Sequence, residues 1–148
     1  MAKAPVYSLK DVITTYSHPD VGSLCLSENG GGRISFNRSG DMSSHTVSAT
    51  GDVVINRLVS KNGTINLEIP TNSVSDKFLD KCVKYLASDK CPSDRYALST
   101  LTIRDRARGT MSTFTGVTFQ KKPDRTYEST SPNMQYALLY AEEIEGAI

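Results

Sequence analysis

Apolar and polar residues alternate along the middle of the chain with the two-residue period of a β-strand. The alternation is cleanest at 64–69, where three apolar residues share one face and polar residues share the other. A β-branched run at 52–59 comes just before it, and Asn62 and Gly63 between the two runs suit the positive φ angles of a type I′ turn. Residues 52–69 are therefore predicted to form a hairpin.

Four further segments show strand patterns of the same kind. The alternation is weaker at 32–38 and 44–50, and it is long and regular at 97–106. In the segment 110–120 the apolar residues change parity near Gly116, which indicates a β-bulge. The last two segments are predicted to form a second hairpin.

One segment follows the three- and four-residue spacing of a helix. Apolar residues recur at this spacing from Val74 to Leu86, and Ser73 or Ser75 can cap the amino-terminal end. A proline and several polar residues follow soon afterwards and end the segment. We expect the one α-helix of the chain at about residues 74–89.

The carboxy-terminal segment at 134–145 is ambiguous. Its apolar residues fit an amphipathic helix, and they fit equally a strand that is buried on both faces. The polar residues 121–133 before it include two prolines and predict a loop. Because no internal repeat or linker interrupts the pattern, residues 1–148 are predicted to form a single, mainly β domain with one helix.

Composition and charge narrow the class of protein. A chain of 148 residues suits one domain, and 38% hydrophobic with 22% charged residues predicts a folded chain. The net charge of +1 provides no overall attraction to nucleic acid or to an anionic membrane. No stretch approaches the roughly 18 continuous apolar residues of a membrane span, and the start of the chain lacks the apolar core of a signal peptide. We expect a soluble, unsecreted protein without a membrane partner.

Residues capable of catalysis or metal binding form no recognisable motif. His18 and His45 are far apart, and Cys82 and Cys91 are nine residues apart rather than in a short metal-binding clip. We expect these two thiols and that of Cys25 to be free, because three cysteines cannot all pair within the chain. The glycine run at 30–32 lacks the Gly-Lys-Ser/Thr of a phosphate-binding loop. The sequence predicts neither an enzyme nor a cofactor. An enzyme that uses His45 is a remote alternative, behind the two other functions given at the end of this section.

Charged residues cluster around the predicted second hairpin and the end of the chain. The basic members are Arg104, Arg106, Arg108, Lys121 and Lys122, and the acidic members at the chain end include Glu142 and Glu143. The arginines could contact phosphates, or they could protect a strand edge from aggregation. Interleaved acidic residues and the lack of stacking aromatics favour the edge interpretation. The opposite charges of the two groups are typical of surfaces that associate with copies of themselves.

Serine and threonine are unusually frequent on otherwise regular strands. The members of this group that share a parity are Ser44, Thr46, Ser48 and Thr50 in one segment, with Thr110, Ser112 and Thr118 in another. An uncharged hydroxyl face suits a wet channel wall past which a polyanion slides without sticking. An ordinary solvent-facing sheet explains the same pattern more simply.

Three stretches of the sequence, taken in order, resemble a known family. They are Gly30 to Phe36, Gly40 to Gly51, and Asn62 to Ile69. Together with the helix and the last three strands, they resemble the tail tube protein of contractile-tailed bacteriophages, in particular a compact subfamily known as a phage structural protein. The resemblance covers nearly the whole chain and rests on the ordered set of segments rather than on any single motif.

The resemblance implies a β-sandwich or rolled-sheet subunit whose strands contribute to a barrel shared between subunits. Such subunits form six-membered rings that stack into a tube inside a contractile sheath, through which phage DNA passes without sequence specificity. The implied partners are further copies of the chain and the sheath, baseplate and tail-terminator proteins, and the implied location is the virion tail, assembled in the host cytoplasm. By the same likeness the segment 135–144 is a strand, and the family carries no catalytic residues.

Within this framework the seven hydroxyl residues named above are the predicted lumen residues. The predicted contacts between subunits are Gly30, Gly31, Gly32, Arg104, Arg106, Arg108, Lys121, Lys122, Glu142 and Glu143. Two other functions fit the same sequence. One is the tube protein of a tailocin or a bacterial secretion machine, and the other is a monomeric β-domain that binds nucleic acid through Arg104, Arg106 and Arg108.

Overall fold

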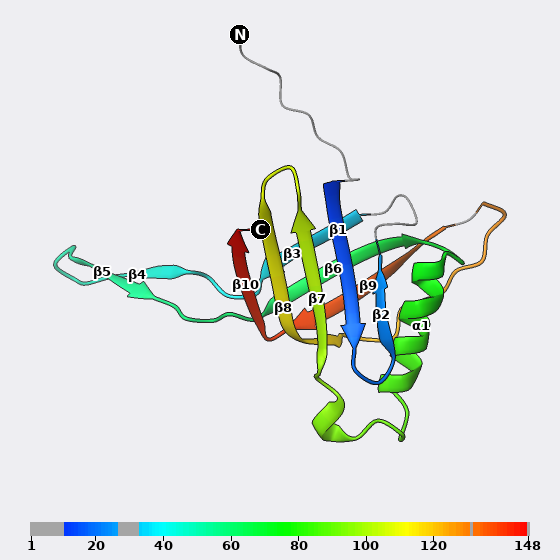
Figure 1. Ribbon diagram of the computed structural model, residues 1–148. Coiled ribbons are helices and arrows are strands. Elements are labelled where there is room, and N and C mark those ends of the chain that lie inside the picture. Colours follow the sequence, from blue (N-terminus) through cyan, green and yellow to red (C-terminus); the bar gives the residue numbers. More distant parts are fainter. Residues whose placement is uncertain (1–10, 27–32, 131, 148) are drawn as a thin grey trace, which may run out of the picture.

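The computed structural model describes residues 11–26, 33–130 and 132–147 (Figure 1). These residues form ten strands, one α-helix and one turn of 3₁₀-helix. The strands are β1 (Val12–His18), β2 (Gly22–Cys25), β3 (Arg33–Arg38), β4 (Ser43–Val47), β5 (Val53–Arg57), β6 (Gly63–Pro70), β7 (Ser99–Asp105), β8 (Thr110–Phe119), β9 (Asn133–Tyr140) and β10 (Glu142–Ala147), and the helices are α1 (Val74–Leu86) and η2 (Ser93–Arg95). The expectation of a mainly β, rolled-sheet chain with one α-helix is confirmed.

Eight of these strands belong to one antiparallel sheet that rolls over on itself. The order is β2-β1-β7-β8-β9-β6-β3, and β10 pairs with β8 along the edge opposite to β7. Strand β8 takes part in both layers, because its first part pairs with β7 and β10 whereas its end pairs with β9. We call β2, β1, β7, β8 and β10 sheet A, and β8, β9, β6 and β3 sheet B.

The passage of β8 from one layer to the other occurs at a glycine. The register between β7 and β8 shifts opposite Thr115 and Gly116, and Gly116 has a φ of +64° that glycine adopts without strain. A Cβ at this position would lie 2.7 Å from the Cβ of Ala141, the residue between β9 and β10. The predicted bulge is confirmed, and it is the point at which the sheet folds over.

The core lies between the two sheets and beneath α1. Side chains with at most 2% exposure come from both sheets and from the helix, among them Tyr16, Leu67, Leu101, Phe114, Leu138 and Leu79. Phe114 of sheet A and Tyr140 of sheet B lie with their ring centroids 4.7 Å apart. Helix α1 lies beside β2 at one end of the rolled sheet (Figure 1).

The helix begins as the sequence predicts and ends slightly earlier. Ser73 is the N-cap, and its hydroxyl accepts a hydrogen bond from the backbone N–H of Asp76 at 3.2 Å. Ser75 is instead buried, and it donates to the carbonyl of Leu26. The last helical residue is Leu86 rather than residue 89.

The predicted hairpin at 52–69 is wrong. Strand β5 pairs with β4, whereas β6 pairs with β3 and β9. Gly63 begins β6 in a buried position, where an added Cβ would lie 2.1 Å from the carbonyl oxygen of Asn37 and 2.4 Å from the hydroxyl of Tyr140. Glycine is needed at residue 63 for this close approach and not for a turn.

The ambiguous carboxy-terminal segment consists of strands, as the family resemblance implies. It is divided at Ala141 into β9, which lies within sheet B, and β10, which pairs with β8. The sequence pattern did not reveal β1, because its inward-facing residues include Thr14 and His18. The imidazole of His18 is satisfied by the carbonyl of Arg95 and the backbone N–H of Asp20, so polar residues occupy core positions there.

Candidate functional site

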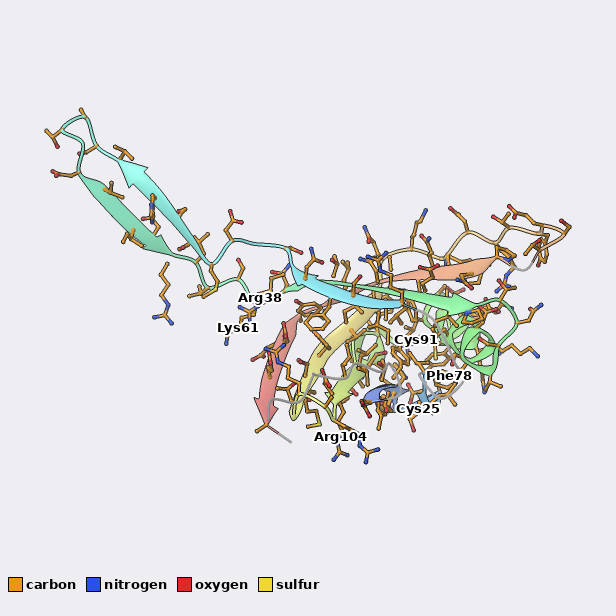
Figure 2. All side chains as sticks on the ribbon, turned by 90° about the horizontal axis from the view of Figure 1, so that it is seen from above. Cys25, Arg38, Lys61, Phe78, Cys91 and Arg104 are labelled. Carbon is orange, nitrogen blue, oxygen red and sulfur yellow. The ribbon has the colours of Figure 1, made fainter. Side chains whose placement is uncertain are left out.

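The feature that distinguishes this chain is a long hairpin that projects from the rolled sheet, and we call residues 39–62 the arm. Both views show it extending away from the remaining described residues, which we call the body (Figures 1 and 2). Backbone hydrogen bonds continue the β4–β5 ladder to the base of the arm, from Leu58 to Met42 at 2.9 Å and from Ser39 to Asn62 at 3.1 Å. The arm is therefore an ordered ribbon along its whole length.

A compact turn closes the tip of the arm. The backbone N–H of Ser48 donates to the carbonyl of Asp52, and the backbone N–H of Gly51 donates to the carbonyl of Ser48. The hydroxyls of Ser48 and Thr50 lie 2.9 Å apart, and Thr50 donates to the Asp52 carboxylate. Gly51 has a φ of +88°, which suits glycine. The local sequence thus determines the turn without help from the body.

The two faces of the arm differ in chemistry, because directly opposed residues of an antiparallel pair lie on the same face. The pairs His45 with Ile55 and Val47 with Val53 make one face, which we call the apolar face. The other face carries Ser44, Thr46, Val54 and Asn56, and the Asn56 side-chain amide donates to the hydroxyls of both Ser44 and Thr46. The second face satisfies its polar groups internally and also carries Val54, whereas the apolar face bears Ser43 and Arg57 only toward the base of the arm.

The apolar face is open to solvent in the single chain. Ile55 is 70% exposed, Val47 is 65% exposed and Val53 is 53% exposed. An isolated two-stranded ribbon is at best marginally stable in water, and contiguous exposed apolar residues mark an interaction surface. The arm therefore presents a contiguous exposed apolar surface in the single chain.

The base of the arm is held by acidic residues of β10. Glu143 lies 3.9 Å from Arg38, and Glu142 lies 3.8 Å from Lys61. Figure 2 labels Arg38 and Lys61 where the arm leaves the body. The two glutamates had been predicted to contact another subunit, and in the single chain they face the base of the arm.

A second large surface is the outer face of sheet A, which we call the hydroxyl face. Six side chains from three adjacent strands lie on it, half-buried by one another: Thr15, Ser17, Thr100, Thr102, Thr113 and Thr115. The Ser17 and Thr100 hydroxyls lie 2.8 Å apart. Periodicity alone did not find this surface, because β1 was not recognised and because pairing between distant strands creates it.

A third surface is a groove of about 600 Å³ on the outer face of sheet B. The connection at 120–130, which we call the strap, forms one wall through Lys121, Asp124 and Thr126. Arg33 and Glu68 lie on the opposite side, so charge of both signs lines the groove. Lys121 is 3.5 Å from Asp124, which places this predicted interface residue in an ion pair within the strap.

Arg125 fastens the strap to the amino-terminal end of α1. Its guanidinium lies 3.4 Å from both carboxylate oxygens of Asp76, which is 1% exposed. Burial alone would raise the pKa of Asp76, but hydrogen bonds from the Tyr136 hydroxyl at 2.6 Å, the Asn72 backbone N–H and Arg125 together lower it. Lys122 lies nearby on a shallow surface shared with the helix.

The predicted basic cluster is spread over a strand and a turn. Arg104, labelled in Figure 2, is on β7. Arg106 and Arg108 are in the turn between β7 and β8, and all three side chains are exposed. The Asp105 carboxylate accepts hydrogen bonds from two backbone N–H groups of this turn. The arginines thus project from a well-ordered hairpin end, and the contacts predicted for them stay a prediction. The predicted contacts at Gly30, Gly31 and Gly32 lie outside the described residues.

The predicted lumen residues occur in two separate places. Ser44, Thr46, Ser48 and Thr50 are on the arm, and Thr110, Ser112 and Thr118 are on β8. Ser112 is only 7% exposed in the single chain, whereas its neighbours Thr113 and Thr115 lie on the hydroxyl face. The assignment of a lumen to these residues stays a prediction.

The remaining candidates for chemistry are the cysteines and the other potential metal ligands. None of the three cysteines forms a disulfide within the described residues, and burial raises the pKa of Cys82 to about 12. Across the described ranges, no group of three or more potential ligands could hold a metal ion. Within the same residues, no helix has the length and apolar character that crossing a bilayer requires.

Comparison with known proteins identifies the family of the chain. A family model described as the bacteriophage PhiTE tail tube protein matches residues 4–146. The chain belongs to this tail tube family. The resemblance inferred from the sequence is confirmed, and the chain is a structural, non-enzymatic component of a phage or phage-like contractile particle.

Solved structures share the fold of this tail tube protein at low sequence identity. A chain of the anti-feeding prophage (AFP) baseplate, six-fold symmetrised, has a TM-score of 0.62 at 9% identity and covers 99% of this chain and 98% of its own. The sheath/tube terminator of PVC, an extracellular contractile injection system, has a TM-score of 0.57 at 12% identity and covers 99% of each chain. The extended PVC sheath-tube complex contains a chain with a TM-score of 0.56 at 10% identity that covers 93% and 88%. No curated protein matches the sequence.

Proposed function

We propose that the chain assembles with copies of itself into a tube, and that the arm makes the contact that joins one copy to the next. The observation that supports this proposal is the exposed apolar face of the arm, with Val47, Val53 and Ile55 all more than half exposed. Because the chain belongs to a tail tube family, the form that we propose for the assembly is a tube. The arm supplies the chain with a projecting docking element on one side.

Burial of the apolar face contributes substantially to the free energy of assembly. Complete burial of an apolar side chain of this size contributes about 1.5–3 kcal/mol, so three such residues offset a large part of the entropy lost on association. The arm already has its ladder and its tip turn in place, which reduces the ordering cost that a disordered segment would incur. A rigid ribbon with one unsatisfied face therefore favours association over isolation.

The position of the arm favours a heterologous contact, in which one surface of a copy meets a different surface of the next. Such contacts propagate, and they close into rings or continue as helices. We propose that the copies form six-membered rings that stack within a contractile sheath, because the family is that of a tail tube and one structure of the same fold comes from a six-fold symmetrised baseplate. Phage DNA is the proposed cargo, and the virion tail is the proposed location.

Electron microscopy and light scattering of the purified full chain test the proposal. We expect rings or tubes above a threshold concentration, and we expect Ile55→Asp to prevent them while the circular-dichroism spectrum of the body is unchanged. Asn56→Asp, on the other face of the arm, is the matched control. A wild-type chain that stays monomeric at high concentration, or an Ile55→Asp variant that assembles normally, would refute the proposal.

The fold likeness to PVC and AFP favours a second candidate cargo. Those chains come from contractile injection systems, so the tube of a tailocin or secretion machine has the same fold. The cargo that co-purifies with particles assembled in the native host distinguishes the two. Protected DNA supports the phage function, and protein cargo or an empty tube supports the other.

A further inference from the structure

We propose that the hydroxyl face of sheet A, together with the apolar residues at its margin, is the surface that receives the apolar face of the arm from a second copy. This inference rests on the proposed function, because it assigns the other half of the contact that the arm makes. The partner is therefore another copy of this chain, and the contact is one sheet face against another.

The first argument is composition. Besides its hydroxyl residues, the outer face of sheet A carries three apolar side chains, Ile13, Met111 and Ile144, of which Ile144 is 56% exposed and Met111 is 38% exposed. Cross-strand pairing connects the strands that bear them, since Arg104 lies opposite both Ile13 and Met111. Threonine methyl groups add hydrocarbon between these side chains. Arg104 and Glu142 stand at the margins of this face, and the surface between them is uncharged and loses little hydration when an apolar ribbon covers it.

The second argument is shape. A two-stranded ribbon packs on a sheet face with the layers about 10 Å apart, which requires that no loop overlies the face and that long charged side chains stay at its margin. At the centre of sheet A, Thr15, Thr102 and Thr113 lie in one cross-strand row of short side chains. The outer face of sheet B does not satisfy this requirement, because the strap overhangs it and because Arg33 and Glu68 line its groove.

The third argument is charge at the margin. Arg57 lies on the same face of the arm as Ile55, near the base, where it pairs with Ser43 across the strands. Glu142 lies opposite Thr115 at the edge of the hydroxyl face, and its side chain is 45% exposed despite its contact with Lys61. An arm laid on this face can bring the guanidinium of Arg57 to that carboxylate. The charges complement each other, and the centre of the contact stays uncharged.

The geometry requires two copies. The arm extends away from its own body in both views, so its apolar face does not cover the hydroxyl face of the same chain (Figures 1 and 2). A copy that gives its arm to one neighbour therefore keeps its own hydroxyl face available for the arm of another. This arrangement extends without a change of conformation, which is the requirement of a propagating heterologous assembly.

The test compares one charge placed on each outer face. Thr102→Lys lies at the centre of the hydroxyl face, and Gln135→Lys lies on the outer face of sheet B. We expect Thr102→Lys to raise the concentration at which the chain assembles by about tenfold or more, as for a central interface position, and Gln135→Lys to change it by less than about twofold. Light scattering measures the threshold, and circular dichroism confirms that both variants fold.

A mixing experiment keeps the test decisive if Thr102→Lys perturbs the fold. A Thr102→Lys chain has an intact arm, and an Ile55→Asp chain has an intact hydroxyl face. We expect neither variant to assemble alone and an equimolar mixture to form one-to-one complexes but no tubes, as read by analytical ultracentrifugation. Formation of the complex also shows that the Thr102→Lys chain is folded.

The outcomes separate the two proposals. If Ile55→Asp assembles normally, the role of the arm and this inference both fail. If Ile55→Asp prevents assembly but Thr102→Lys and a second variant, Thr113→Lys, assemble like wild type, the proposed function stands and the assignment of the receiving surface is wrong. If Gln135→Lys prevents assembly and Thr102→Lys does not, the groove under the strap receives the arm instead.

Discussion

In the body, most apolar side chains on strands are covered by the opposite sheet or by α1, whereas in β4 and β5 of the arm they face solvent. Phe114 is fully buried and touches Phe36 and Tyr140, with ring centroids 5.0 and 4.7 Å apart. Ile55, on an equally regular strand, is 70% exposed. The difference teaches that strand formation and burial are separate properties in this chain, because the arm keeps its ladder by local hydrogen bonds while its apolar side chains stay exposed in the single chain.

The largest expected effect is on the body. Phe114→Ala removes a ring from the junction of the two sheets and should lower the free energy of unfolding by about 3–5 kcal/mol. Ile55→Ala, its matched change in the arm, should alter the free energy of unfolding of the monomer by less than about 0.5 kcal/mol. Urea unfolding below the assembly threshold measures both. Equal losses would show that the arm packs on its own body.

The second prediction concerns the clasp between the strap and the helix. Asp76→Asn keeps the shape of the side chain but removes the charge that Arg125 and Tyr136 contact, and should lower the free energy of unfolding by about 1.5–3 kcal/mol. The arm contains no comparable buried ion pair among its described residues, and Asp52→Asn at its tip is the control. Thermal unfolding monitored by circular dichroism separates the two.

The pH dependence of stability should follow from the same clasp. Because the pKa of Asp76 is lower in the folded chain than the unfolded value of about 3.9, its contribution is complete above that value and is lost as the pH falls through the folded pKa. Asp20, whose pKa the Arg95 guanidinium lowers to about 2, adds to this loss in wild type and in the variant alike. Asp76→Asn should therefore show a smaller loss of stability between pH 5 and 2 than wild type, by denaturant titration at each pH. An identical slope would exclude Asp76 from the acid sensitivity.

Two glycines, one in the body and one in the arm, extend the comparison between these regions with smaller expected effects. A Cβ at Gly63 would overlap the Asn37 carbonyl and the Tyr140 ring, so Gly63→Ala should destabilise the body by about 1–3 kcal/mol. Gly51→Ala meets nothing within 4 Å, and its cost is the backbone strain of a positive φ at the tip of the arm, about 1–2 kcal/mol and confined to the arm. Hydrogen exchange should show faster exchange in β4 and β5 alone for Gly51→Ala. Faster exchange throughout the sheet would show that arm and body unfold together.

The smallest expected effect distinguishes the two faces of the arm. Asn56→Ala removes exposed hydrogen bonds to Ser44 and Thr46 and should change the stability of the monomer by less than about 0.5 kcal/mol. If only the apolar face docks, the assembly threshold should stay within about twofold of wild type. A large increase in that threshold, measured by light scattering, would mean that both faces are covered in the assembly.

Much of the fold could be predicted from local patterns, and the failures have physical causes. The spacing of apolar residues located α1, and the hairpin of β7 and β8 followed from alternation on both sides of a turn. Strand β1 was missed because a hydrogen-bonded His18 and a buried Thr14 take core positions that a pattern search assigns to apolar residues. The pairing of β5 was wrong because a run of Val and Ile is as typical of an exposed docking strand as of a buried one.

The sequence by itself determined most of the strands in the middle of the chain, the helix and the point at which β8 bends, because these depend on residues close together in the chain. It also indicated that hydroxyl residues and opposite charges take part in assembly. Only the tertiary structure decided which hydroxyl side chains share a surface, since Thr15, Thr102 and Thr113 come from strands that meet only when the sheet forms. The tertiary structure also decided that the hairpin of β4 and β5 stands outside the core. Because β6 pairs with β3 and β9, strands β4 and β5 pair only with each other.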